Sequence, residues 1–140
     1  LLGVLLLCAC DEPLTLEQQV IATMRNMEAH VEARERRAFM AYVAEDFEGQ
    51  DGEFNKDQLN GLLLYYLRRY AQLNAQLLPV KVESRGEDFA EATFQVLLTG
   101  GEGVLPQSGQ LVDVSSSWKR KDGEWLLQTA RWTPLRMGPN

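Results

Sequence analysis

The spacing of apolar residues changes near Leu73 from a helical to an extended pattern, and this change limits the fold more than any other feature. Up to Leu73, apolar residues recur every three or four positions, as on one face of a helix: Val20, Met24, Met27 and Val31, then Leu59, Leu62, Leu63, Tyr66, Leu67, Tyr70 and Leu73. Beyond it they alternate with polar residues, as in half-buried strands: Leu78, Val80 and Val82, then Ala92, Phe94, Val96 and Leu98. Helices followed by antiparallel strands predict an α+β fold with the helices packed on one face of a curved sheet.

Capping signals mark where the helices begin. Thr15 is followed three residues later by Gln18, and Asn55 by Gln58, as in capping boxes. We therefore expect two successive helices, or one bent helix, over residues 15–44 and a third helix from Asn55 to about Leu73. A short extended piece over residues 46–49 and a turn over residues 50–53 separate them.

A hairpin is predicted around Asp122-Gly123, because Asp-Gly favours a two-residue type I′ turn. Regular pairing outward from this turn places Trp118 opposite Leu127 and Val114 opposite Arg131, on the face that meets the helices. An arginine among apolar neighbours can anchor a carboxylate or phosphate. The alternative is an Arg131 that reaches solvent or pairs with an acid such as Asp46.

The same register predicts a surface on the opposite side of the sheet. Leu126, Ala130 and Trp132 would lie on that outward face together with Ser115 and Ser117. An exposed tryptophan on a sheet is typical of a surface that meets a partner. We therefore expect a homodimer through the sheet as one use of this face.

The chain opens with LLGVLLLCACDEP, an apolar run that ends in Cys8-Ala9-Cys10 and then turns acidic. The run is shorter than the ~20 residues of a membrane-spanning helix and has the length of a signal-peptide apolar region. Leu7-Cys8-Ala9-Cys10 resembles the lipobox of bacterial lipoproteins. The resemblance implies that residues 1–9 are a removed signal peptide and that Cys10 is lipidated. The alternative is a buried N-terminal strand or helix with two core cysteines.

The lipobox also bears on location. Residues 10–14 would form a lipidated tether and residues 15–140 a domain facing the periplasm at the bacterial cell envelope. Asp11 directly after the lipidated cysteine implies the inner membrane if the sorting rule of enteric-type bacteria applies. Cys8 would leave with the signal peptide and Cys10 would be lipidated, so no free cysteine pair would remain and we expect no disulfide.

Three segments resemble the nuclear transport factor two-like (SnoaL-like) superfamily: EAHVEARERRAFMAYVAEDFEGQDG, NKDQLNGLLLYYLRRY and VDVSSSWKRKDGEWLLQTARWTP. These are loose patterns of packing and turns, so they indicate a fold more than an activity. The resemblance implies a cone-shaped domain with a pocket between sheet and helices. Members include isomerases, dehydratases and cyclases, and many only bind ligands.

The candidates for lining this pocket are Tyr66, Tyr70, Trp118 and Arg131. Tyr66 and Tyr70 lie one turn apart on the apolar stripe of the third helix, and a buried tyrosine needs a partner for its hydroxyl. The alternative is that both rings pack in the core with their hydroxyls at its rim.

No catalytic residue or cofactor is predicted. The single histidine, His30, shares a helix face with Asn26 and Arg34, and no acid faces inward on the predicted sheet. A metal site is also not expected: the run from Asp51 has the alternating spacing of a calcium loop, but Lys56 and Leu62 replace its glycine and final glutamate.

Charge excludes one class of partner. The chain has 14 Lys and Arg against 20 Asp and Glu, a net charge of −6, which argues against nucleic acid binding. Basic clusters at residues 34–37, 68–69 and 119–121 are then solvated faces or contacts to anionic lipid headgroups.

These observations predict a lipid-anchored envelope protein whose domain binds a small apolar or anionic molecule without catalysis. A protein-interaction module with a filled cone, and a lyase or isomerase of the SnoaL-like type, are the alternatives.

Overall fold

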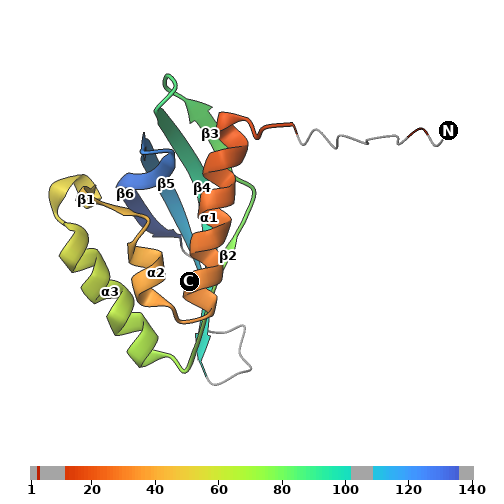
Figure 1. Ribbon diagram of the computed structural model, residues 1–140. Coiled ribbons are helices and arrows are strands. Elements are labelled where there is room, and N and C mark those ends of the chain that lie inside the picture. The colour runs from red at the N-terminus through yellow and green to blue at the C-terminus, as the bar shows by residue number, and fades with distance from the viewer. Residues whose placement is uncertain (1–2, 4–11, 102–108, 136–140) are drawn as a thin grey trace.

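The computed structural model describes residue 3, residues 12–101 and residues 109–135 (Figure 1). The predicted lipidation site Cys10 and nearly all of the predicted signal peptide lie outside the described residues. Within the described part, no helix has the length and apolar character needed to cross a membrane. The elements are α1 (Leu16–Glu32), α2 (Arg36–Met40), β1 (Val43–Gly49), the 3₁₀ turn η1 (Gln50–Gly52), α3 (Lys56–Arg69), β2 (Gln72–Leu77), β3 (Lys81–Ser84), β4 (Phe89–Gly101), β5 (Gln110–Lys121) and β6 (Glu124–Leu135).

The strands form one mixed sheet with the helices on one face (Figure 1). The order is β1-β6-β5-β4-β2, and β3 pairs with β4 beside β2. β1 runs parallel to β6, and all other pairs are antiparallel. The α+β fold with helices on a curved, mostly antiparallel sheet is therefore confirmed.

Both predicted capping boxes are present. The side chains of Thr15 and Asn55 each accept a hydrogen bond from the backbone N–H three residues on, and Gln18 and Gln58 bond back to the cap residues. These reciprocal bonds satisfy N–H groups that a helix start otherwise leaves without a partner.

α3 ends at Arg69, earlier than its apolar spacing predicts. Arg34, which follows α1 with a φ of 61°, donates hydrogen bonds to the carbonyl oxygens of Tyr70 at 3.1 Å and Ala71 at 3.3 Å, and also to that of Leu67. Tyr70 is extended, with φ −118° and ψ 125°. An arginine distant in the sequence therefore donates to the last carbonyl groups of α3. The helix ends there, and Leu73 lies in β2.

Two further expectations about boundaries need correction. Residues 43–44 belong to β1 and not to a helix, because α2 already ends at Met40. The alternating run from Leu78 to Glu83 is not one strand: β2 ends at Leu77 and β3 starts at Lys81. Pro79 lies between them and has no N–H to donate to a sheet ladder.

The hairpin turn forms as predicted, but the pairing beyond it shifts by one residue. Asp122 and Gly123 both have positive φ, 53° and 79°, as in a type I′ turn. Trp118 faces Leu127 as expected, whereas the next partners are Ser117 and Thr129. Gln128 therefore has no cross-strand partner, and a β-bulge interrupts β6.

The bulge reverses the faces of the rest of β6, because neighbouring residues in a strand point to opposite sides. Val114 is opposite Trp132, and Arg131 is opposite Ser115 on the outward face. Ala130 is 9% exposed and belongs to the core, and Trp132 packs against that core. The predictions of an inward Arg131 and of an outward Ala130 and Trp132 are therefore wrong.

Trp132 also restricts which residue β1 can carry beside its ring. Its ring meets Phe54 edge-on at 5.4 Å. A Cβ built on Gly49 would lie 2.9 Å from the Trp132 ring, so only glycine fits there.

Deleting Gln128 tests this register. The deletion would turn Arg131 into the core and Trp132 outward, so we expect a loss of more than about 3 kcal/mol in the free energy of unfolding, or no folding at all. Urea unfolding followed by tryptophan fluorescence measures it.

The control is Gln128→Ala, which keeps the extra residue and removes only a half-buried side chain with one long hydrogen bond to Asp46, at 3.4 Å. It should change stability by less than about 0.5 kcal/mol. A deletion variant as stable as the parent would show that β6 pairs without a bulge.

Candidate functional site

A cavity of about 260 Å³ lies between the helices and the inner face of the sheet. The residues that line it come from nearly every element: Met24, Met27, Glu28 and Val31 from α1, Phe39 from α2, Leu63 and Tyr66 from α3, Leu73, Ala75 and Leu77 from β2, Phe94, Val96 and Leu98 from β4, Val114, Ser116 and Trp118 from β5, and Leu127 and Ala130 from β6. The wall is almost entirely carbon. The wall is apolar because alternate residues along each strand and one apolar stripe of the helices point toward the same space.

Ser116 is the buried polar residue of the wall, with 7% exposure. Its hydroxyl donates to the carbonyl oxygen of Ala92 at 2.8 Å and accepts the indole N–H of Trp118 at 2.9 Å. Both polar groups are therefore satisfied within the sheet, and neither needs a ligand.

Glu28 is the one carboxylate among the lining residues, and its side chain is 19% exposed. Its Oε2 accepts the backbone N–H of Leu77 at 2.6 Å, which ties α1 to the end of β2. Its Oε1 lies 3.8 Å from Arg25. Sequence reasoning missed Glu28, although its position four residues after Met24 and three before Val31 puts an acid on the apolar face of α1.

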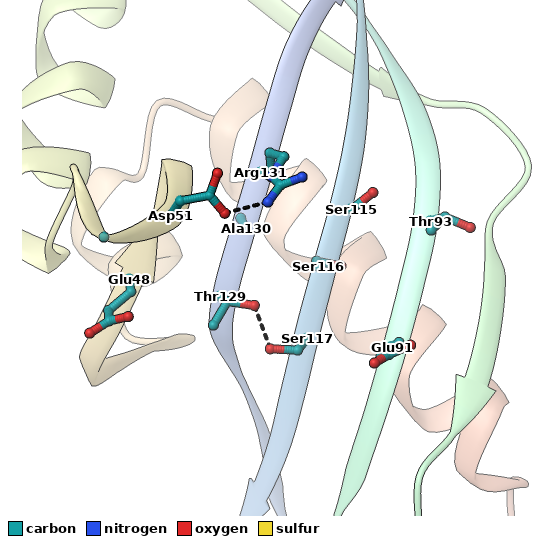
Figure 2. A pocket seen from close by; sticks show the side chains of 11 residues that line it. Glu48, Asp51, Glu91, Thr93, Ser115, Ser116, Ser117, Thr129, Ala130 and Arg131 are labelled. Carbon is teal, nitrogen blue, oxygen red and sulfur yellow. Dashed lines mark hydrogen bonds and ion pairs between the residues drawn. The ribbon is translucent and has the colours of Figure 1, made fainter.

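The structure brings two of the four predicted pocket residues to the cavity. Tyr66 and Trp118 line it. Tyr70 lies behind Tyr66, with its ring stacked at 6.2 Å and 11°. Arg131 is on the other side of the sheet, where it forms an ion pair with Asp51 (Figure 2).

Arg131 belongs to a second, polar groove of about 470 Å³ on the outward face of the sheet (Figure 2). Its lining includes Glu48, Asp51, Glu91, Thr93, Ser115, Ser117 and Thr129. Arg131 and Asp51 are 62% and 71% exposed, so their ion pair contributes little to stability. The side chains that line the groove carry mainly carboxylates and hydroxyls, and the groove is open to water. Pairing of two copies through this face stays a prediction.

The shifted pKa values lie away from the cavity. A hydrogen bond from Lys56 lowers the pKa of Glu45, and one from Lys119 lowers the pKa of Asp46. A hydrogen bond to Glu91 raises the pKa of Arg85. All three groups are on the exposed surface, where ion pairs are a sufficient explanation.

The cavity offers little for acid–base chemistry. His30 does not line it: the ring lies 5.9 Å from that of Tyr42, and its Nδ1 is 3.3 Å from Glu35. Within the described residues, no group of three or more His, Cys, Asp or Glu side chains is placed to hold a metal ion.

Comparison with solved structures identifies the fold. A nuclear transport factor two-like protein of unknown function from Pseudomonas putida superposes with a TM-score of 0.72 at 17% identity, covering 84% of each chain. A putative scytalone dehydratase from Novosphingobium aromaticivorans gives 0.72 at 13% identity, covering 86% of this chain and 84% of that one. A Nostoc punctiforme protein of unknown function with a cystatin-like fold gives 0.67 at 15% identity, covering 85% and 92%.

No protein-family model and no curated protein matches the sequence. The likeness is therefore one of structure at low sequence identity, and it shows the fold alone. That fold is the nuclear transport factor two-like α+β fold, shared by proteins of unknown function and by a protein named as a dehydratase.

Replacing Ser116 tests whether its hydroxyl is the acceptor that the buried indole N–H of Trp118 needs. Ser116→Ala leaves the indole N–H of buried Trp118 without an acceptor, so we expect a loss of about 1–3 kcal/mol in the free energy of unfolding. The neighbouring change Ser115→Ala affects an exposed hydroxyl and should shift stability by less than about 0.5 kcal/mol. If urea unfolding showed that both changes lower the free energy of unfolding equally, Ser116 would not be the acceptor that Trp118 needs.

Proposed function

We propose that this domain binds a small apolar molecule in the cavity between helices and sheet, without catalysis. One observation carries the proposal: a carbon-lined space of about 260 Å³ in an otherwise packed core. Protein interiors are close-packed and contain few voids larger than a water molecule. An apolar cavity excludes water and takes apolar guests. Each methylene of a ligand moved there from water contributes about 0.8 kcal/mol.

The cavity itself separates binding from the two alternatives. A cone filled by side chains would favour a protein-interaction module, and the space between Met27, Tyr66 and Phe94 argues against that. A lyase or isomerase needs a base and a donor arranged around the reacting atoms. Glu28 is the single carboxylate of the wall, and one of its oxygens already accepts the N–H of Leu77.

The second part of the proposal is the location. The lipobox-like Leu7-Cys8-Ala9-Cys10 supports attachment of the protein to a bacterial envelope membrane by lipid on Cys10. α1 begins at Leu16, six positions after Cys10 (16 − 10), so the connecting chain spans at most roughly 20 Å. Such a tether would keep the binding domain close to the membrane surface.

Filling the cavity tests the binding proposal. Ala75 is half-buried and faces the cavity, so Ala75→Trp should occupy the space and reduce binding of a neutral apolar fluorescent probe, N-phenylnaphthylamine, by at least tenfold. Ala71→Trp places the same ring on the exposed chain before β2 and should leave binding unchanged. No saturable probe binding by the unchanged protein would refute the proposal.

Metabolic labelling tests the anchor. In bacteria that express the complete precursor, labelled palmitate should enter the protein, and Cys10→Ser should abolish the incorporation. Cys8→Ser is the matched control and should keep it, because Cys8 would leave with the signal peptide. Label that persists in the Cys10→Ser form would exclude lipidation at Cys10.

A further inference from the structure

The residues on the sheet side of the cavity follow a diagonal path from β2 to β6. At each level of this path, two neighbouring strands contribute inward-facing residues that lie opposite each other. The pairs, in order along the path, are Ala75 with Leu98 on β2 and β4, Phe94 with Val114 on β4 and β5, and Trp118 with Leu127 on β5 and β6. The sheet side of the cavity is therefore a trough about two strands wide.

The trough is long in comparison with this width. Four strand positions separate Leu98 from Phe94, and another four separate Val114 from Trp118. At about 3.3 Å per residue the path follows the strands for roughly 26 Å, whereas neighbouring strands lie about 4.8 Å apart. The helix α1, which lies against β2, lines the trough over roughly 10 Å of its length (Figure 1). A space of about 260 Å³ spread along this path is narrow, so it suits one extended hydrocarbon chain better than a ring system.

The two ends of the trough differ in their exposure to solvent. Trp118 and Leu127 are 2% and 8% exposed, so the trough is closed at their end. Ala75 and Leu98, at the other end, are half-buried. A ligand therefore reaches the trough from the side of β2 and β4 and lies with its leading end at Trp118.

The polar groups at the closed end are already paired with one another. The indole N–H of Trp118 donates to the hydroxyl of Ser116, and that hydroxyl donates to the carbonyl oxygen of Ala92. Throughout the described residues, no buried side-chain nitrogen or oxygen lacks a hydrogen-bond partner. Burying a hydroxyl of the ligand without a partner is unfavourable. A polar group on the ligand is therefore favoured at the half-buried end and disfavoured at the closed end.

We propose that the ligand is a single-chain lipid, an unbranched hydrocarbon chain with at most one polar group. This inference rests on the proposed binding function and specifies its ligand class. The chain lies along the trough with its apolar end at Trp118 and its polar group between Ala75 and Leu98. Compact ring systems do not match the shape of the trough. Chains with a polar group at both ends would have to bury one of them.

A series of primary alcohols from butanol to decanol tests the shape, each by displacement of N-phenylnaphthylamine from the full chain. Each added methylene should tighten binding about fourfold, up to decanol, because each one leaves water for the trough. Cyclooctanol should bind about tenfold more weakly than 1-octanol, which has the same number of carbons. A gain that ends by hexanol, or equal binding of these two alcohols, would overturn the proposal while the binding function stands.

The diol 1,8-octanediol tests the closed end. It should bind at least about tenfold more weakly than 1-octanol, since its second hydroxyl would be buried without a partner. Equal affinity of the diol and 1-octanol would show that both ends of the cavity reach water, and it would overturn the proposal.

Val114→Phe narrows the trough halfway along its path. The gain per methylene should then stop at a shorter alcohol than in the unchanged protein, while butanol binds as before. Ser115→Phe is the matched control, because it places the same ring on the exposed, outward face of β5 and should leave the whole series unchanged.

A gain that continues to decanol in Val114→Phe would overturn the proposal. If this substitution prevents folding, the alcohol series and the diol on the unchanged protein decide alone. A protein that binds neither the probe nor any alcohol would refute the binding function itself.

Discussion

One residue without a cross-strand partner, Gln128, decides which side chains of the last strand are inside. Before it, Leu127 faces the helices opposite Trp118; after it, Ala130 and Trp132 take the inward positions. Without this bulge, the charged Arg131 would face the cavity and Trp132 would face water. The carbon character of the cavity wall, and the packing of Trp132 over Gly49 and Phe54, both depend on this shift.

Two long-range polar contacts fix the positions of the helices and β2 around the cavity that results. Glu28, which lies between Met27 and Val31 in the cavity wall, accepts the backbone N–H of Leu77 and joins α1 to β2. Arg34 joins the end of α1 to the last carbonyl groups of α3. Because these groups are used to fix the elements, the space between them is left to hydrocarbon. The wall that these contacts hold in place is almost entirely carbon, so the domain can hold an apolar guest.

The sequence predicts those features of the fold that local chemistry determines. Thr15 and Asn55 cap helices through bonds to residues three positions away, and Asp122-Gly123 adopts the left-handed conformations of its turn. The end of α3 could not be predicted in this way, because Leu73 continues the helical spacing and the arginine that terminates the helix is Arg34, far away in the chain. A gap in the alternation, from Trp125 and Leu127 to Ala130 and Trp132, did carry the signal of the bulge. The cavity has no such signal, since its volume depends on how closely the helices approach the sheet.

Crystals of the protein under xenon pressure test most directly whether the core is hollow, since xenon enters dry apolar cavities. The account predicts a xenon atom between Met27, Tyr66 and Phe94, on the inner side of the sheet. Electron density in which side chains fill this space and xenon is absent from it would contradict the account.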